Sequence, residues 1–223
     1  MLDISLLDIV ALAALILSVV IHEVAHGAMA LRLGDETAKL AGRLTLNPIK
    51  HLDLVGSFLF PLFLKLAGAP FILGWAKPVP YDPTRLHKDL RYGPLKVALV
   101  GPASNLLVAL IIGIIIRAGD SFLSLESIGF LGFVVFLNIL LAVFNLLPIP
   151  PLDGSKVLPL FLPPRAIFAI EKVGFLGVII ILALLLYSGV LGFINNLSLA
   201  FSTFVIGSQN TLPLIDFLQR LLG

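Results

Sequence analysis

Apolar segments long enough to cross a membrane dominate this chain. The first runs from about Leu6 to Leu31, and others run from about Leu54 to Leu73, Leu95 to Ile116, Ile128 to Leu147 and Val173 to Val190. A helix needs about 20 consecutive apolar residues to span the hydrocarbon core of a bilayer. Because 59% of the 223 residues are hydrophobic and only 13% are charged, we expect a multi-pass membrane protein.

The predicted fold is all-α, with about five to six membrane segments in one membrane-embedded domain covering residues 1–223. A sixth segment from Leu191 to Gly207 is weak because it contains Asn195 and Asn196, and Pro213 begins a short amphipathic end. The formal net charge is only +2, and the basic residues lie in connecting segments, which argues against nucleic-acid binding. The chain has no cysteine, so any metal must have nitrogen and oxygen ligands.

The basic loops predict the topology. Arg32, Lys39, Arg43 and Lys50 follow the first segment, and residues 77–96 form a second basic loop. The positive-inside rule places both loops in the cytoplasm. Residues 54–73 are then expected to form a re-entrant element, although an ordinary span with one basic outer loop is the alternative. The proline-rich stretch at residues 74–81 predicts extended chain or an edge strand.

The first segment contains His22-Glu23-Val24-Ala25-His26. A charged side chain at the bilayer centre costs at least ~2.5 kcal/mol, so ionisable residues within a membrane point to function. Residues four apart share one face of a helix, so His22 and His26 can bind one metal ion with Glu23 beside it. The alternative is an interhelical hydrogen-bond cluster.

A zinc site of this kind needs a third protein ligand. Asp153 is the leading candidate because it follows the segment that returns to the cytoplasmic side, where prolines end the helix. Taken alone, its Pro-Pro-Leu-Asp-Gly sequence is also typical of a turn in which Asp caps the next helix. Asp53 and Glu171 are weaker candidates because each lies near basic residues in an apparent loop.

These motifs resemble the site-2 protease family of intramembrane zinc metalloproteases. The sequence from His22 to Gly27 is similar to its metal-binding helix, and Asn145 to Gly154 matches its NxxPxPxxDG pattern. Gly101 to Asn105 matches its GPxxN motif. Residues 47–53 and 74–80 resemble the small prokaryotic branch that lacks PDZ and CBS domains, and the catalytic core is expected at about 6–158, followed by C-terminal membrane helices at about 165–223.

The resemblance implies that His22, His26 and Asp153 bind one Zn²⁺ per chain and that Glu23 is the catalytic base. A substrate helix must unwind locally before its amides can be attacked. Asn145 and Asn105 could bind the exposed backbone, although interhelical packing or helix capping is the alternative for each. An extended segment at residues 76–79 could also pair with the substrate.

The predicted function is hydrolysis of peptide bonds within or near transmembrane segments of membrane-protein substrates. The protein is expected in the cell membrane, in contact with the lipid bilayer, with its active site toward the cytoplasm. A metal-ion transporter and a catalytically silent membrane scaffold are the alternatives. His51 and His87 are expected to be solvated loop residues.

Overall fold

The computed structural model describes residues 5–53, 55–59, 76–163, 165–167, 172 and 188–222. The chain divides into two compact units. Residues Ile16–Val97 form one, which we call the histidine unit. Residues Met1–Leu15 and Ala98–Gly223 form the other, which we call the bundle unit.

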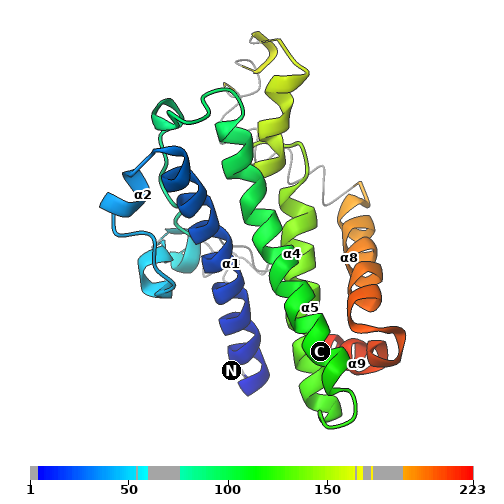
Figure 1. Ribbon diagram of the computed structural model, residues 1–223. Helices are drawn as coiled ribbons and strands as arrows, with labels where there is room; N and C mark the ends of the chain where they lie inside the picture. The colour runs from blue at the N-terminus through cyan, green and yellow to red at the C-terminus, as the bar shows by residue number, and fades with distance from the viewer. Residues whose placement is uncertain are drawn as a thin grey trace. The chain divides into compact units, whose positions relative to one another are not determined.

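Among the described residues, three helices are long and apolar enough to cross a membrane: α1 (Leu6–Leu33), α4 (Gly93–Gly119) and α5 (Leu125–Asn145). They confirm the expected segments at 6–31, 95–116 and 128–147. A fourth crossing is reached if α8 (Val190–Ile206) and α9 (Thr211–Leu222) are taken as one bent element. The chain turns by 118° between them, through η5 (Ser208–Asn210) (Figure 1).

The described residues do not contain the expected five to six segments. Of residues 54–73, only the π-helical turn η2 (Val55–Leu59) is described, so the re-entrant element falls largely outside the described part. The segment from 173 to 190 likewise falls outside it, apart from its last three residues.

Besides the second half of α1, the histidine unit contains several short helices. These are α2 (Thr37–Leu40), η1 (Pro48–His51), η2 and η3 (Pro83–Arg85). Gly34 ends α1 with φ +113°, a conformation that favours glycine. The core consists of Ala30, Leu33, Leu86 and Val97, all buried.

For residues 74–81 the sequence predicted extended chain or an edge strand, and the edge strand is not observed in the described part of this stretch. Residues 76–82 form neither a helix nor a strand in the described part of the chain. Pro78 and Pro80 have no backbone N–H, so this stretch cannot donate the regular hydrogen bonds of a β-ladder. Its backbone instead bonds to scattered partners, such as His51 O, which accepts from Lys77 N at 2.8 Å.

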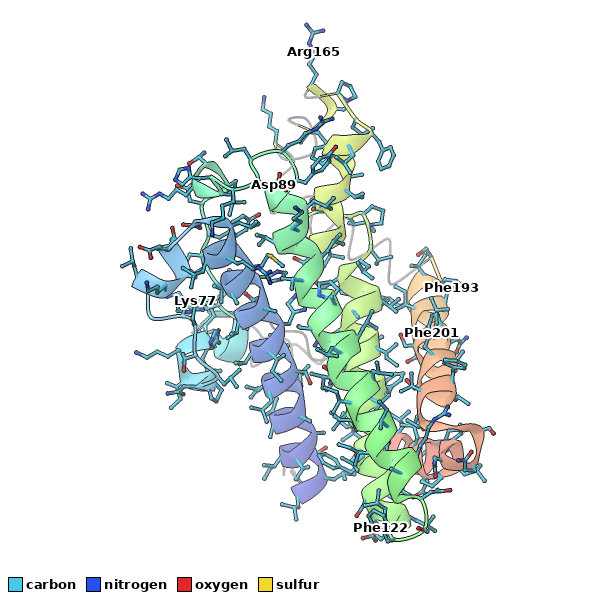
Figure 2. All side chains as sticks on the ribbon, viewed as in Figure 1. Lys77, Asp89, Phe122, Arg165, Phe193 and Phe201 are labelled. Atoms are coloured by element: carbon cyan, nitrogen blue, oxygen red, sulfur yellow. The ribbon has the colours of Figure 1, made fainter. Side chains whose placement is uncertain are left out.

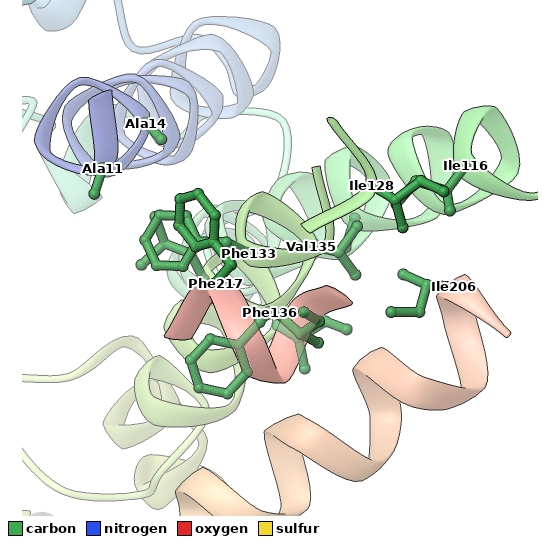
Figure 3. Packing of buried hydrophobic residues seen from close by; sticks show 13 residues of the cluster. Ala11, Ala14, Ile116, Ile128, Phe133, Val135, Phe136, Ile206 and Phe217 are labelled. Atoms are coloured by element: carbon green, nitrogen blue, oxygen red, sulfur yellow. The ribbon is translucent and has the colours of Figure 1, made fainter. Parts of the chain in front are cut away.

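In the bundle unit, α8 and α9 both pack against α5. Phe133 of α5 and Phe217 of α9 have ring centroids 5.2 Å apart, and Phe136 and Ile206 lie in the same cluster (Figure 3). Small residues permit this packing, because a Cβ at Gly129 would lie 2.8 Å from the carbonyl oxygen of Pro213. Such close backbone approach is typical of helix interfaces in membranes.

One exposed face of α8 carries large apolar side chains, although Asn195 and Asn196 are also exposed on this helix. Phe193 and Phe201 point away from α5 and are 66% and 50% exposed (Figure 2). In water such a face would be costly, whereas a lipid environment solvates it favourably. The helix is therefore suited to contact with acyl chains.

The C-terminal end of α8 is capped by a distant side chain. Arg117, near the end of α4, donates from Nε to Val205 O at 2.8 Å and from Nη2 to Phe204 O. These carbonyls belong to the last turn of α8, where no intrahelical donor is available. The contact places the C-terminal ends of α4 and α8 together.

Candidate metal centre

His22 and His26 form a close pair on one face of α1. Their Nε2 atoms are 3.0 Å apart, and the two rings stand nearly perpendicular, at 87°. Both side chains are buried, with 6% and 8% of their surface exposed. The predicted i, i+4 arrangement of the histidines is therefore present in the structure.

A backbone carbonyl orients His26. Its Nδ1 lies 2.6 Å from the carbonyl oxygen of Val97. Because a carbonyl oxygen can only accept, Nδ1 carries the ring proton and donates it. The lone pair of the neutral ring is then on Nε2, which faces His22. Metal-binding histidines are commonly oriented by such an outer hydrogen bond.

This donor pair fits zinc. Two imidazole nitrogens in a tetrahedral site with Zn–N distances of about 2.0–2.1 Å lie roughly 3.3 Å apart. The observed separation of 3.0 Å is close to that value, and nitrogen donors match the preference of Zn²⁺.

Glu23 lies between the two histidines in sequence, and its carboxylate is held by the backbone. Its Oε2 accepts a hydrogen bond from Val79 N at 2.7 Å. The donor is 56 residues away in sequence, in the 76–82 stretch, so a loop fixes one oxygen of this carboxylate.

Asp153 begins η4 (Asp153–Leu160), after the proline-rich end of α5. A Cβ on the next residue, Gly154, would lie 2.5 Å from the carbonyl oxygen of Leu147 and would also overlap the backbone of Leu146. Glycine is therefore required for this turn. Asp153 belongs to the bundle unit and the histidines to the histidine unit, so its role as third ligand remains a prediction.

The two asparagines singled out from the sequence both make hydrogen bonds within the bundle unit. Asn105 is fully buried, and its Nδ2 donates to Asn138 Oδ1 at 2.8 Å. Asn145 is half-buried, and its Nδ2 donates to Leu141 O at 2.9 Å. The Asn105 bond is the interhelical packing considered as an alternative, while the substrate role of each asparagine stays a prediction.

Four further residues were considered from the sequence: His51, His87, Asp53 and Glu171. His51 is only 1% exposed, and its Nε2 lies 2.9 Å from Thr45 O, so the expectation of a solvated side chain is wrong for this residue. His87 is exposed, as expected. Asp53, a weaker ligand candidate, accepts from Gly56 N at 2.6 Å, and Glu171 falls outside the described residues.

Sequence reasoning missed Arg43, Asp35 and Asn138. Arg43 is 6% exposed, and its Nη2 donates to Lys77 O at 2.6 Å. Burial opposes ionisation of Asp35, but hydrogen bonds from Thr37 and from Asp82 N outweigh it and hold its pKa below the ordinary value. The sequence did not distinguish Arg43 from the other basic residues of its loop, because a buried arginine and an exposed one that sets the topology have the same local pattern.

Comparison with known proteins gives consistent matches. The model of peptidase family M50 matches residues 112–188. "Putative zinc metalloprotease YwhC" of Bacillus subtilis is 42% identical over 157 residues, which cover 67% of this chain and 68% of that protein. "Putative zinc metalloprotease Rip2" of Mycolicibacterium smegmatis is 35% identical over 161 residues, which cover 70% of this chain and 59% of that protein.

A third relative matches a shorter part of the chain. "Putative zinc metalloprotease MJ0611" of Methanocaldococcus jannaschii is 44% identical over 63 residues, 28% of this chain and 32% of that protein. No solved structure matches the chain significantly.

Proposed function

This chain belongs to peptidase family M50, the site-2 protease family of zinc metalloproteases, and from this premise we propose that it cleaves within or near transmembrane segments of membrane-protein substrates. The observation that carries the proposal is the buried pair of His22 and His26, 3.0 Å apart, beside Glu23 on an apolar helix. A peptidase site on such a helix is suited to substrates that share the membrane.

In the proposed site, His22, His26 and Asp153 would hold one zinc ion. Two buried imidazoles, with the tautomer of His26 fixed by Val97 O, supply the nitrogen donors. Asp153 supplies an oxygen donor, and a catalytic site keeps one position open. A zinc ion bound there lowers the pKa of a water molecule to about 7 and polarises a carbonyl group.

Glu23 is the proposed general base. Its Oε2 is held by Val79 N–H, so Oε1 can accept a proton from water and later donate it to the leaving amine. Orientation favours this role, because a base must stay within hydrogen-bond reach of the proton that it removes.

The substrate must expose backbone before hydrolysis. A helix in lipid hides its carbonyls in internal hydrogen bonds, so the cleaved stretch has to unwind against polar groups. We assign that role to Asn145, which is half-buried near the end of α5. Asn105 could assist only after exchanging its bond with Asn138.

Both units are proposed to act as one catalytic domain in the cell membrane. The basic loops at residues 32–50 and 77–96 favour an orientation in which they face the cytoplasm. His26 lies six residues before Arg32 on α1, about 9 Å along the helix axis at 1.5 Å per residue. The active site is therefore expected below the cytoplasmic surface of the membrane.

The test uses purified protein in proteoliposomes with a set of synthetic single-span peptides. The peptides differ in the depth of an Asn-Gly pair that destabilises their helix. Wild-type protein should cleave those whose pair lies near the cytoplasmic side, and Glu23→Gln should abolish cleavage while retaining zinc. Glu36→Gln is the matched control, because this exposed glutamate pairs with Lys39 on the surface. Cleavage by Glu23→Gln at the wild-type rate would refute the mechanism.

The ligands are tested separately by metal analysis. His22→Ala and Asp153→Ala should each lower the zinc content below one per chain. If either variant still binds one zinc ion with unchanged affinity, that residue is not a ligand. An ion-flux assay on the same vesicles distinguishes a metal-ion transporter from a protease, and zinc binding without cleavage of any peptide would indicate a silent scaffold.

A further inference from the structure

We propose that residues 76–82 position the carboxylate of Glu23 through the single N–H of Val79, and that Arg43 is the residue that fixes this segment. We call residues 76–82 the proline segment. The inference rests on the proposed role of Glu23 as general base. It adds a positioning residue, Arg43, that lies 20 positions from Glu23 in the sequence.

The first step is the proline pattern. In Lys77-Pro78-Val79-Pro80, both prolines lack an N–H, so Val79 carries the only backbone donor between Lys77 and Tyr81. A residue before proline is also restricted to extended conformations, which limits Lys77 and Val79. The sequence thus builds a stiff segment with one donor, and that donor is bonded to Glu23 Oε2 at 2.7 Å.

The second step is the anchoring of the segment on both sides of Val79. On the N-terminal side, Lys77 N donates to His51 O at 2.8 Å, and Arg43 Nη2 donates to Lys77 O at 2.6 Å. On the C-terminal side, Asp82 N donates to Asp35 Oδ2 at 2.6 Å. The backbone is therefore held two and three residues away from the donor that contacts Glu23.

The third step concerns the kind of residue at position 43. Burying a guanidinium is costly unless its donors find acceptors. The hydrogen-bond partners that the structure gives Arg43 are the carbonyl oxygens of Lys77 and, at a longer 3.4 Å, Pro78. Both carbonyls accept from the same nitrogen, Nη2, and Nε is buried with no hydrogen-bond partner among the described residues. The two carbonyls of the proline segment are therefore the contacts that hold this guanidinium.

The fourth step is the shape of α1 beneath the segment. Gly27 lies one turn after Glu23, and a Cβ there would come within 2.7 Å of Val79 Cγ1 and also of Leu44 Cδ2. The missing side chain lets Val79 approach the helix closely enough to bond with Glu23. Glu23 and Gly27 thus form the surface of α1 that the proline segment contacts.

The kinetic test uses the peptide that the wild-type protein cleaves best. Arg43→Gln should lower kcat about 10- to 100-fold, which does not exceed the 10²- to 10⁴-fold that a general base contributes, with KM and zinc content unchanged. Arg43→Lys should restore part of the loss, because an ammonium group can still donate to a carbonyl. Arg91→Gln should retain the wild-type kcat, because this exposed arginine lies over the ring of Tyr92.

A backbone test isolates the N–H. Val79→Pro removes the donor and the valine side chain and preserves an extended conformation, whereas Val79→Ala keeps the donor and removes only side-chain packing. We expect Val79→Pro to lose more kcat than Val79→Ala.

Amide hydrogen exchange gives a readout that needs neither zinc nor activity. Because Pro78 and Pro80 have no amide, exchange between Lys77 and Tyr81 reports Val79 alone. Glu23→Ala and Arg43→Gln should each speed its exchange about tenfold or more, as expected when a protecting hydrogen bond opens locally. Arg91→Gln should leave it unchanged.

The outcomes separate the two proposals. If wild-type protein cleaves no peptide, or Glu23→Gln cleaves normally, the proposed function fails while the exchange result still tests the contact. If Glu23→Gln is inactive but Arg43→Gln and Val79→Pro keep the wild-type kcat, the positioning role is wrong. If Arg43→Gln loses zinc and activity in parallel, Arg43 has only a structural role.

Discussion

Replacing Asp35 by asparagine should destabilise the histidine unit. Asp35 is fully buried, and its two oxygens accept three hydrogen bonds. Oδ1 accepts from Thr37 N at 3.0 Å and from Thr37 Oγ1 at 2.5 Å, while Oδ2 accepts from Asp82 N at 2.6 Å. In Asp35→Asn the amide oxygen can keep the Thr37 bonds, but the NH₂ group then faces the N–H of Asp82.

The expected loss of stability follows from this one contact between the NH₂ group introduced by Asp35→Asn and the N–H of Asp82. A hydrogen bond to a charged group contributes about 1.5–3 kcal/mol, and an unsatisfied buried donor costs about 1–3 kcal/mol. Because part of each cost is relieved by relaxation, we expect a loss of about 2–4 kcal/mol. At about 2–4 °C per kcal/mol for a chain of this size, Tm should fall by roughly 5–15 °C.

The chain contains a matched control for this variant. Asp82 also accepts from the N and Oγ1 of a threonine two residues later, Thr84, but its side chain is 38% exposed. Asparagine caps such turns about as well as aspartate, so Asp82→Asn should cost less than about 1 kcal/mol. Differential scanning fluorimetry in detergent measures both variants. Equal Tm values for Asp35→Asn and Asp82→Asn would refute the reasoning.

The same residue predicts a pH dependence. Hydrogen bonds lower the pKa of Asp35 in the folded state despite its burial, so the unfolded chain binds its proton more tightly. The stabilisation is therefore fully present above the ordinary pKa of about 3.9 and is lost as the pH falls through the lower folded value. The Tm difference between wild type and Asp35→Asn should shrink below about pH 4. A constant difference down to pH 2 would contradict this.

Three further outcomes are expected. A double-mutant cycle with Asn105→Leu and Asn138→Leu should give a coupling energy of about 0.5–1.5 kcal/mol, measured by unfolding in detergent, because each single variant removes the hydrogen bond that joins α4 and α5 through these two amides. Gly129→Ala should destabilise the bundle unit by about 1–3 kcal/mol, because its Cβ would lie 2.8 Å from Pro213 O, and a Tm equal to wild type would contradict the close packing. Removing zinc with a chelator should abolish cleavage and adding zinc should restore it, whereas chelator-resistant cleavage would exclude a zinc mechanism.

The long helices could be predicted from sequence because their signal is local. The bounds expected for α1, α4 and α5 differ by no more than three residues from those observed. The i, i+4 histidine pair was also predictable, because helical geometry alone brings His22 and His26 together. The bend between α8 and α9 was harder to predict from the sequence, since Ser208–Asn210 resembles any polar turn.

The contacts around Glu23 could not be read from the sequence. Val79 acts through its backbone N–H, which every residue except proline possesses, and its partner is 56 residues away. Arg43 looked like one more cytoplasmic positive charge, although it is buried. The prolines at positions 78 and 80 were visible and predicted extended chain or an edge strand, but they did not indicate that the N–H of Val79 would bond to Glu23.

The contact of Arg117 with the last turn of α8 has a consequence for the direction of the chain. The C-terminal end of a helix carries a partial negative charge, so this pole neutralises the positive charge at the end of α4. Since α4 and α8 end together, they run in the same direction. In the proposed orientation, α4 runs from the cytoplasm to the outer side of the membrane. The guanidinium of Arg117 then holds the C-terminal end of α8 and the start of α9 on that outer side. Because its charge is neutralised there, this arginine does not oppose the cytoplasmic placement of the basic loops.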